Sequence, residues 1–379
     1  MSAPSAPAPI VVQKYGGSSV ADLDKIRAVA ERIAATVADG RRVIAVVSAM
    51  GNTTNELIAL AQQASPAPDR RELDMLISVG ERITMALLAM CLRDLGVAAR
   101  SLTGSQSGII TDERHADAQV VEVRPDRLLQ TVEDGTVAIV AGFQGVSRQR
   151  EVTTLGRGGS DTTAVVLAAA VKAEHCEICS DVDGVFSADP RVVPSAAKLE
   201  DLPLEAAVEL ARGGAKVLFE DAVRYARDHG VRLTASSTFG PGSGTRLQVK
   251  DAPTKPVAVT SDHQLVAVST SAADVWSLLA ACGARVRSVE GGQAIVDIRN
   301  VHGALPDALE AQPVARVRAV ASALAERPDR WHRAHDALQV DGIDVQAHGA
   351  AGDVVWWQVP AERLSDAVRV VHEALHRPG

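Results

Sequence analysis

The sequence predicts an α/β fold built on a mainly parallel central sheet, followed by a smaller α+β region. Two observations predict the first part: strand-like and helical patterns alternate over about 240 residues, and the strand-like stretches are continuously apolar. A third observation, a change in the sequence pattern after a segment rich in proline and glycine, predicts the second part. A chain of 379 residues is long enough for two or three domains with buried cores.

The first expected strand is Ile10–Lys14, which leads into Gly16 and Gly17. A helix follows it, because apolar side chains recur on one face from Ile26 to Val37 before Gly40 ends the pattern. Further strands are expected at Val43–Ser48, Arg100–Thr103, Val137–Phe143, Glu177–Ser180 and Val231–Ser236, and further helices at Glu72–Leu95 and Thr162–Ala173.

A breaker cluster of Pro241, Gly242 and Gly244, followed by Pro253 and Pro256, indicates a domain boundary near residue 250. We therefore expect a tail over residues 1–9, a first domain over 10–250 and a second region over 251–379.

The second region is expected to hold small βαβ units, either as one compact module or as two modules related by an imperfect internal duplication. Strands are predicted at Leu265–Ser269, Val286–Val289, Ala294–Ile298 and Val354–Val359, and helices at Ala272–Cys282, from Ala315 onward and at Ala361–Leu375.

Composition excludes several partners. The chain has 39 basic and 47 acidic residues, a formal charge of −8, which argues against binding to nucleic acid or anionic membranes, because such binding depends on Lys and Arg. The longest apolar runs fall short of the ~20 residues of a membrane span, so no membrane partner is expected. Residues 1–9 lack a basic start and an apolar core, which indicates a disordered tail and a cytoplasmic location.

The four cysteines are too few for a disulfide framework. Cys176 and Cys179 form a CxxC, but no second pair completes a metal site. A structural role is therefore expected for them.

Two glycine-rich turns are candidate anion sites. The first runs from Lys14 to Ser19 and the second from Gly156 to Thr163; each lies between an extended segment and a helix, where free backbone N–H groups and the positive helix end face the same space. Either turn alone is a weak signal. Ser160 or Asp161 is also suited to cap the second helix.

A larger set of motifs resembles the aspartate kinase family. It consists of KYGGSSV at Lys14–Val20, VSAMGNTTNEL at Val47–Leu57, Ser101–Gly104 with Thr111 and Asp112, AGFQG at Ala141–Gly145, TTLGRGGSDTTA at Thr153–Ala164, DVDGVFSADPR at Asp181–Arg191 and GAKVL at Gly214–Leu218. The resemblance implies the three-layer amino-acid-kinase fold, MgATP as phosphoryl donor and the β-carboxylate of L-aspartate as acceptor, giving 4-phospho-L-aspartate.

The resemblance also implies catalytic residues: Lys14, Arg157 and Asp161. Lys14 would neutralise charge on the transferring phosphoryl group, since such transfer depends on positioning and charge stabilisation. A side-chain carboxyl with a pKa near ~3.9 is already ionised at neutral pH, so no general base is required. Asp161 is therefore expected to orient Lys14 or the acceptor, with a helix-cap role as the alternative.

The binding residues are carried over in the same way. Glu81 is expected to contact the amino group of the acceptor and Arg157 to make a fork to a carboxylate, although Glu81 with Arg82 alone would suggest a solvated helix pair. The remaining acceptor-binding residues implied are Ser48, Thr54, Phe143, Gly159 and Ser160. The nucleotide-binding residues implied are Lys14, Gly16, Gly17, Ser18, Ser180, Asp181, Asp183, Phe186, Arg191 and Lys216. No protein ligand for the metal is assigned, because Mg²⁺ would be carried by the ATP phosphates.

Some positions depart from the family's pattern. Phe186 stands where Tyr is usual, and Glu220 and Asp221 follow GAKVL where Pro and then a small or basic residue are common. Two acids near a triphosphate would weaken nucleotide binding, so altered donor affinity is expected.

The C-terminal region resembles the paired ACT-type modules of the family, most clearly at Val354–Leu375. The effector-binding loops are not recognisable between 260 and 350, and Gln346–Asp353 lacks the usual Ser- and Thr-rich segment. We therefore expect retained assembly as a homodimer or higher homo-oligomer and weakened control by lysine and threonine. Of the adjacent Trp356 and Trp357, one should face the core and the other outward.

Two alternatives stay open: a kinase for another small amino acid, and a catalytically idle relative that senses amino acids or acts as a scaffold. Joint retention of Lys14, Arg157, Asp161 and Lys216 argues against the idle relative, which would not need charges aimed at a phosphate.

Overall fold

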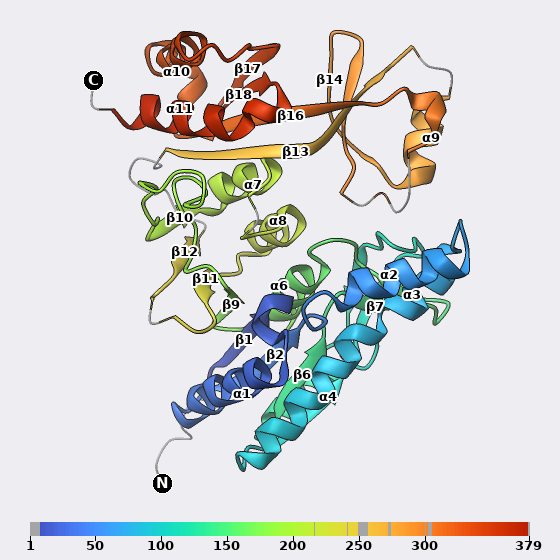
Figure 1. Cartoon of the computed structure of the whole chain (residues 1–379). Coiled ribbons are helices and arrows are strands. Elements are labelled where there is room, and N and C mark those ends of the chain that lie inside the picture. The colour runs from blue at the N-terminus through green and yellow to red at the C-terminus, as the bar shows by residue number, and fades with distance from the viewer. Residues whose placement is uncertain are drawn as a thin grey trace. The chain divides into compact units, whose positions relative to one another are not determined.

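The computed structural model describes residues 8–215, 217–240, 242–248, 257–271, 274–299, 301 and 305–377 (Figure 1). The chain divides into two compact units. The first comprises the chain up to Gly184 together with Asp221–Val249, and the second comprises Val185–Glu220 together with the chain from Lys250 onward. The expected boundary near residue 250, most of the expected N-terminal tail and Lys216 lie outside the described residues.

The first unit is built on a sheet with the strand order β12-β11-β9-β1-β2-β6-β3. Neighbouring strands from β11 to β3 are parallel, and β12 is antiparallel to β11. In chain order the strands are β1 (Ile10–Tyr15), β2 (Arg42–Val47), β3 (Ala99–Leu102), β6 (Val137–Ala141), β9 (His175–Ser180), β11 (Leu233–Ser237) and β12 (Thr245–Gln248). The predicted α/β fold with a mainly parallel sheet is confirmed.

The central strands are buried on both sides, as their continuously apolar sequences predict. Tyr15 belongs to the cluster under α1 (Leu23–Ala38) and α4 (Val79–Asp94). Successive side chains of a strand alternate between faces, so Lys14 lies on the opposite face, which α6 (Gly159–Ala170) covers. Helices on both faces of the sheet produce the expected three layers.

The expected single helix Glu72–Leu95 is two helices, α3 (Arg70–Ile77) and α4, which meet at Ser78. The stretch Arg70–Asp94 is long enough for a membrane span, and its most apolar 18-residue window has a mean hydropathy of 1.7, although no apolar run of that kind was expected. Of that window, 44% is buried. Length and composition alone do not separate such a segment from the core helix of a folded unit.

A second, smaller sheet in the first unit was not predicted. Its order is β5-β4-β7-β8, with β4 (Ile109–Thr111), β5 (Val120–Val123), β7 (Gln144–Ser147) and β8 (Val152–Thr154). Three- and four-residue strands are too short to show a clear period in the sequence. The remaining helices here are η1 (Gly17–Val20), α2 (Thr53–Ala64), α5 (Asp126–Glu133) and α8 (Glu220–His229), whose first residue closes a segment of the second unit.

The second unit is built on an antiparallel sheet with the order β14-β15-β13-β16-β18-β17. The strands are β13 (Ala258–Ser269), β14 (Arg285–Glu290), β15 (Gln293–Asp297), β16 (Gln312–Val320), β17 (Ala347–Ala351) and β18 (Val354–Val359). The helices are α7 (Leu204–Arg212), α9 (Val275–Cys282), η2 (Asp307–Leu309), η3 (Leu324–Glu326), α10 (Pro328–Val340), η4 (Ala361–Arg363) and α11 (Leu364–His376), and this unit also holds the short strand β10 (Asp201–Pro203). The expected α+β region is confirmed.

The helix expected from Ala315 is wrong, because Gln312–Val320 is strand β16 and the helix α10 begins only at Pro328. The physical reason is a period of two: Ala315, Val317 and Ala319 enter one core cluster, and Arg316 and Arg318 lie on the other face.

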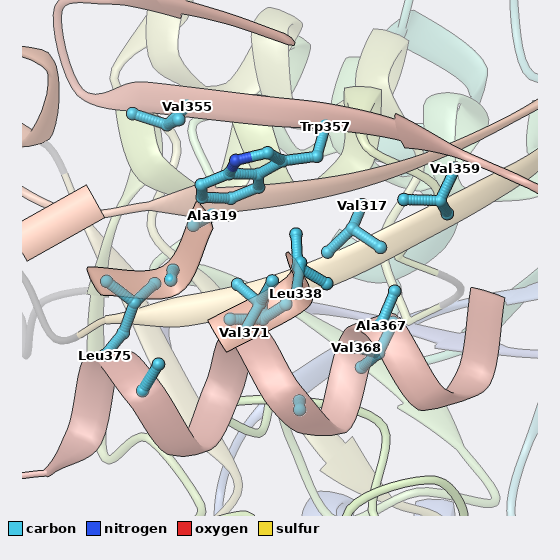
Figure 2. Packing of buried hydrophobic residues seen from close by; sticks show 14 of the residues in the cluster. Val317, Ala319, Leu338, Val355, Trp357, Val359, Ala367, Val368, Val371 and Leu375 are labelled. Carbon is cyan, nitrogen blue, oxygen red and sulfur yellow. The ribbon is translucent and has the colours of Figure 1, made fainter. Parts of the chain in front are cut away.

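The core of the second unit is centred on Trp357, which is fully buried. Figure 2 shows Trp357 and Val317 on the strands facing Val368, Val371 and Leu375 of α11. Trp356 lies on the other face of β18, where the Arg316 guanidinium stacks 3.9 Å from its ring centroid. The expected division of the two tryptophans between faces is confirmed, and Arg316 covers the outer one.

Candidate active site

Four strands place predicted site residues at one edge of the central sheet. Lys14 is near the end of β1, Ser48 directly follows β2, Phe143 follows β6 and Ser180 ends β9. These strands are adjacent and parallel in the order β9-β1-β2-β6, so their carboxyl ends meet at the same edge. In open parallel sheets this edge is the usual place for ligands.

Backbone hydrogen bonds connect the loops at this edge. Gly16 N–H donates to Cys179 O at 3.2 Å, Ser48 N–H to Tyr15 O at 3.1 Å, and Gly142 N–H to Val47 O at 3.0 Å. The chain segments that follow the four strands are therefore held side by side.

Lys14 and Asp161 form a buried ion pair, with the Lys14 Nζ 2.6 Å from Asp161 Oδ1. The side chains are 10% and 3% exposed, so both charges lie almost wholly out of water. Asp161 Oδ1 accepts no well-directed hydrogen bond, so the contact is an ion pair alone. The ammonium is held in place by charge and retains donors that a second anion can use.

The first glycine turn leaves little room for a side chain at Gly17. A Cβ on Gly17 would lie 3.0 Å from Ala49 O and 3.3 Å from Gly51 O, and one on Gly16 would lie 3.4 Å from Lys14 Nζ. Gly51 N–H donates to Gly17 O at 3.1 Å, which ties the turn to the loop after β2. Glycine at position 17 therefore lets the turn pack closely against the loop that follows β2.

The second glycine turn leads into α6. Gly158 is the N-cap with φ of 73°, and no side chain caps the helix, so the suggestion that Ser160 or Asp161 caps it is wrong. The left-handed backbone at Gly158 lets α6 begin immediately and brings Asp161 into its first turn, where it contacts Lys14. Arg157, in the same turn, is exposed.

Glu81 is a buried acid in the first turn of α4, and only 3% of it is exposed. Its Oε1 accepts a hydrogen bond from Ala49 N–H at 3.1 Å, while Oε2 is buried and has no partner among the described residues. Burial disfavours the charged form and raises the pKa of Glu81 to about 7. A carboxylate in this state is suited to receive a cationic group from a ligand.

The loop after β6 reaches the start of α6. Phe143 has φ of 67°, a left-handed conformation that is strained for a bulky residue. Its N–H donates to Thr163 Oγ1 at 3.1 Å, and a Cβ on Gly142 would lie 2.7 Å from Ser160 Oγ. Gly159 is likewise packed against Phe143, so Phe143, Gly159 and Ser160 adjoin one another as the acceptor prediction requires.

The expected nucleotide residues fall into three groups. The first group lies in the first unit. Its Ser18 is exposed, and its Ser180 Oγ accepts a hydrogen bond from Val182 N–H at 3.1 Å, in the turn that contains Asp181 and leads to Asp183. Phe186 and Arg191 belong to the second unit, and Lys216 lies outside the described residues. The structure therefore brings together only the part of this set that follows β1 and β9.

Glu220 forms ion pairs with arginines of its own unit. It contacts Arg212 at 2.9 Å and also Arg287, and these partners, against the opposing effect of burial, hold the pKa of Glu220 below its usual range. Asp221 pairs with Arg224 at 2.9 Å. Much of the negative charge expected to disturb a triphosphate is thus already balanced.

Metal-ligating clusters are absent from the described part of the chain: no group of three or more His, Cys, Asp or Glu side chains could hold an ion there. Cys91, Cys176, Cys179 and Cys282 are free. Burial raises the pKa of Cys176 and of Cys179, which makes both thiols inert and agrees with a structural role.

Sequence reasoning missed three polar residues near the site: Asp74, Gln144 and Thr163. Thr163 bonds the strained Phe143, as described above, and Gln144 and Asp74 connect the smaller sheet to the helices α3 and α4. Thr163 and Gln144 lie within the quoted motifs but carry no chemistry that separates them from packing residues. Asp74 is an acid within an amphipathic helix, a pattern that by itself suggests exposure.

The chain is similar to known proteins both in sequence and in structure. A sequence model of the amino acid kinase family matches residues 9–234. An aspartokinase of Mycobacterium bovis is 54% identical over 254 residues, covering 66% of this chain and 60% of the relative. An aspartokinase of Thermus thermophilus is 39% identical over 397 residues, covering 96% of this chain and 98% of the relative. The chain thus spans 60% of the length of the mycobacterial relative.

Among solved structures, E. coli aspartokinase III in complex with aspartate and ADP superimposes with a TM-score of 0.84 at 24% identity, covering 97% of this chain and 100% of the other. Aspartate kinase from Synechocystis gives a TM-score of 0.58 at 32% identity, covering 97% of this chain and 70% of the other.

Proposed function

The chain belongs to the amino acid kinase family, among its aspartokinases, and on that premise we propose that it transfers the γ-phosphoryl group of ATP to the β-carboxylate of L-aspartate. The product would be 4-phospho-L-aspartate. The observation that carries the proposal is the pairing of two features at one sheet edge: the buried Lys14–Asp161 ion pair and the buried Glu81, whose Oε2 lacks a partner among the described residues.

Glu81 supplies the recognition of the amino group. An ammonium bound at Oε2 would complete the hydrogen bonding of the carboxylate and offset the cost of keeping its charge out of water. Arg157 supplies a planar fork for a carboxylate of the same molecule. Ser48, Thr54, Phe143, Gly159 and Ser160 would complete the acceptor pocket.

Lys14 acts on the phosphoryl group. Phosphoryl transfer leaves little covalent work to the protein, so rate depends on alignment and on stabilising charge as the group moves. Asp161 holds the Lys14 ammonium at 2.6 Å from the α6 side, so that its donors meet the phosphoryl oxygens without rearrangement. The acceptor carboxylate is ionised before it binds, and no residue has to remove a proton from it.

The donor fits the backbone around β1 and β9. We place the donor phosphates at the Gly16–Gly17 turn, beside the Lys14 ammonium, and Ser18, Ser180, Asp181 and Asp183 of the same unit would contribute to the nucleotide site. The resemblance also implies Phe186, Arg191 and Lys216 as nucleotide-binding residues, and their role stays a prediction. Mg²⁺, when bound, would neutralise phosphate charge; because the described residues form no cluster of metal ligands, we propose that ATP carries it.

Trapping of the product with hydroxylamine tests the proposal, because acyl phosphates form stable hydroxamates. The protein is incubated with MgATP, hydroxylamine and one acceptor at a time: L-aspartate, L-glutamate or N-acetyl-L-aspartate. Hydroxamate formed with L-aspartate and lost on N-acetylation supports the proposal. Hydroxamate formed with another acceptor identifies a different amino acid kinase, and none with any acceptor indicates the idle sensing or scaffolding relative.

We further propose a cytoplasmic location and assembly through the second unit. Four free cysteines suit a reducing compartment. Trp276, Val286 and Val289 are exposed apolar side chains on α9 and the edge strand β14, a surface that a second copy of the chain could cover in a homodimer or higher homo-oligomer.

A further inference from the structure

A buried carboxylate outside the proposed pocket joins three segments of the first unit. Asp74 on α3 is fully buried. Its carboxylate accepts hydrogen bonds from Thr154 Oγ1 at 2.5 Å, from Thr154 N–H at 3.1 Å and from Ala116 N–H at 3.1 Å, and it contacts His115 Nδ1 at 2.8 Å. Removing any one of these donors would leave the buried carboxylate short of a hydrogen bond, which is costly, so the three segments depend on one another at this point.

A second set of hydrogen bonds joins the same hairpin to the helices. Thr154 on β8 is paired with Gln144 on β7 in the antiparallel ladder. The Gln144 Nε2 donates to Ser78 O at 2.8 Å, and the Arg82 Nε donates to Gln144 Oε1 at 3.3 Å. The β7–β8 hairpin is therefore bonded to α3 at Asp74 and again at the junction of α3 with α4.

These two connections link the two arms of the proposed acceptor pocket. On one side, Ser78 precedes α4, whose first turn carries Glu81. On the other side, β7 directly follows Phe143, and β8 leads through Leu155 into the turn that carries Arg157. Leu155 N–H donates to Phe143 O at 2.9 Å, which extends the hairpin to the strained residue itself.

We propose that Asp74, through Thr154, is a positioning residue that sets the separation between Glu81 and the Phe143–Arg157 side of the acceptor pocket. This inference rests on the proposed function. Asp74 lies outside the set of residues proposed to contact either substrate, and its hydrogen bonds run to the acceptor arms and not to the Gly16–Gly17 turn. Loosening it should therefore weaken acceptor binding and leave donor binding unchanged.

Thr154→Val is the direct test, because it removes the hydroxyl that donates to Asp74 and keeps the side-chain shape. We expect the KM for L-aspartate to rise about tenfold and the KM for MgATP to change less than twofold. Thr154→Ser retains the hydroxyl and should keep the KM for aspartate within about threefold of the wild-type value. Asp74→Asn should raise the KM for aspartate in the same direction, if the variant folds.

A matched control separates positioning from lost stability. The Thr131 Oγ1 on α5 donates to Arg127 O at 2.8 Å, and this residue is also buried, away from the hairpin. Thr131→Val should lower Tm about as much as Thr154→Val and leave both KM values unchanged. Equal rises of both KM values in Thr154→Val, no rise for aspartate, or a rise in Thr131→Val would each overturn the proposal.

Amide hydrogen exchange tests the Asp74–Thr154 connection independently of the proposed function. If the wild-type protein makes no hydroxamate with aspartate, the proposed function fails, and exchange still reports on the connection. Thr154→Val should then increase amide exchange both in residues 74–82 and in residues 142–158. An increase confined to the residues around position 154 would overturn the connection itself.

Discussion

Glu81 has the least favourable environment of the charged residues at the proposed site. One carboxylate oxygen is bonded to Ala49 N–H, the other has no partner among the described residues, and burial raises the pKa of the side chain to about 7. A group held in this way lowers the stability of the folded chain and gains from a ligand that brings a positive charge. Such a conflict between stability and function is common where a site is built for binding.

The pH dependence of aspartate binding follows from the raised pKa of Glu81. Below pH 7 the ligand-free Glu81 is protonated, so the KM for L-aspartate should rise about tenfold for each further pH unit, and it should level off above pH 7. Glu81→Gln should abolish this limb and raise the KM about 100-fold, since loss of a buried ionic partner costs about 2–5 kcal/mol. Initial rates at varied aspartate between pH 5.5 and 8.5 measure both effects.

The raised pKa of Glu81 also predicts how the free energy of unfolding changes with pH. The folded-state pKa lies above the ordinary value of 4.5, so the protonated form favours folding, and stability is lost as the pH rises from 4.5 through 7. At pH 8, Glu81→Gln should therefore be more stable than the wild type by up to about 3 kcal/mol. Equal unfolding free energies of the two proteins at pH 8, in urea titrations, would contradict the burial argument.

Arg157 should act through its shape as well as its charge. Arg157→Lys keeps a cation but cannot donate two parallel hydrogen bonds to one carboxylate, so the KM for aspartate should rise at least tenfold. Arg148→Lys, at an exposed arginine that contacts Glu122 only at 3.8 Å, serves as the control and should leave the KM unchanged. An unchanged KM in Arg157→Lys would remove the fork from the mechanism.

At this scale the motifs point to the charged residues of the proposed site, and the structure shows that two of them, Lys14 and Asp161, form an ion pair. The Lys14–Asp161 contact could be anticipated from the motifs but not from spacing, because the two residues are far apart in the sequence. Asp74 could not be anticipated, since nothing in the pattern of a short amphipathic helix marks one acid as buried. Only the contacts made by β8 and the 112–118 loop reveal it.

Among the elements, the two glycine turns lie next to Lys14 and Asp161 of the proposed site. The first packs closely against the loop that follows β2, and the second lets α6 begin at a left-handed residue. The sequence predicts both as turns into a helix that could hold an anion.

A paired substitution separates backbone strain from placement of α6. Gly158 and Gly40 have φ of 73° and 81°, so alanine at either position costs about 1–2 kcal/mol of stability. Gly40 has open space around it and lies at the end of α1, away from the sheet edge that carries the site. Gly158→Ala should lower kcat/KM at least tenfold, and Gly40→Ala should lower only Tm; comparable losses of activity would show that stability alone is responsible.

The helices and strands that are long and buried were predicted most accurately from the sequence. Strands β1, β2 and β6 are continuously buried, and their sequences predict them within one or two residues. The sequence of β16 suggests a helix instead, because alanine and arginine favour helices and conceal a period of two. The smaller sheet was missed because its strands of three or four residues are too short to show a period in the sequence.

For the whole molecule, the second unit keeps an antiparallel sheet with a well-packed core around Trp357. We propose that its effector loops are degenerate. Activity should therefore change less than twofold when millimolar lysine and threonine are added together, measured at subsaturating aspartate. Strong inhibition would show that an effector site persists.

The alternation of strands and helices predicted the fold class of each unit, but a boundary drawn along the sequence could not describe units made of interleaved segments. Val185–Glu220 belongs to the second unit and Asp221–Val249 to the first. Long-range contacts create this arrangement, and no local change of composition records it.

The account depends most on Lys14 as the cation that meets the transferring phosphoryl group. Lys14→Met leaves Asp161 without its buried partner, so Lys14→Met combined with Asp161→Asn serves as the neutral control for stability. The decisive measurement is kcat for hydroxamate formation with L-aspartate at saturating MgATP. A fall of about 100- to 1,000-fold in Lys14→Met and in the double variant, with Tm of the double variant near that of the wild type, is the predicted result. Turnover within tenfold of the wild type in either variant would contradict it.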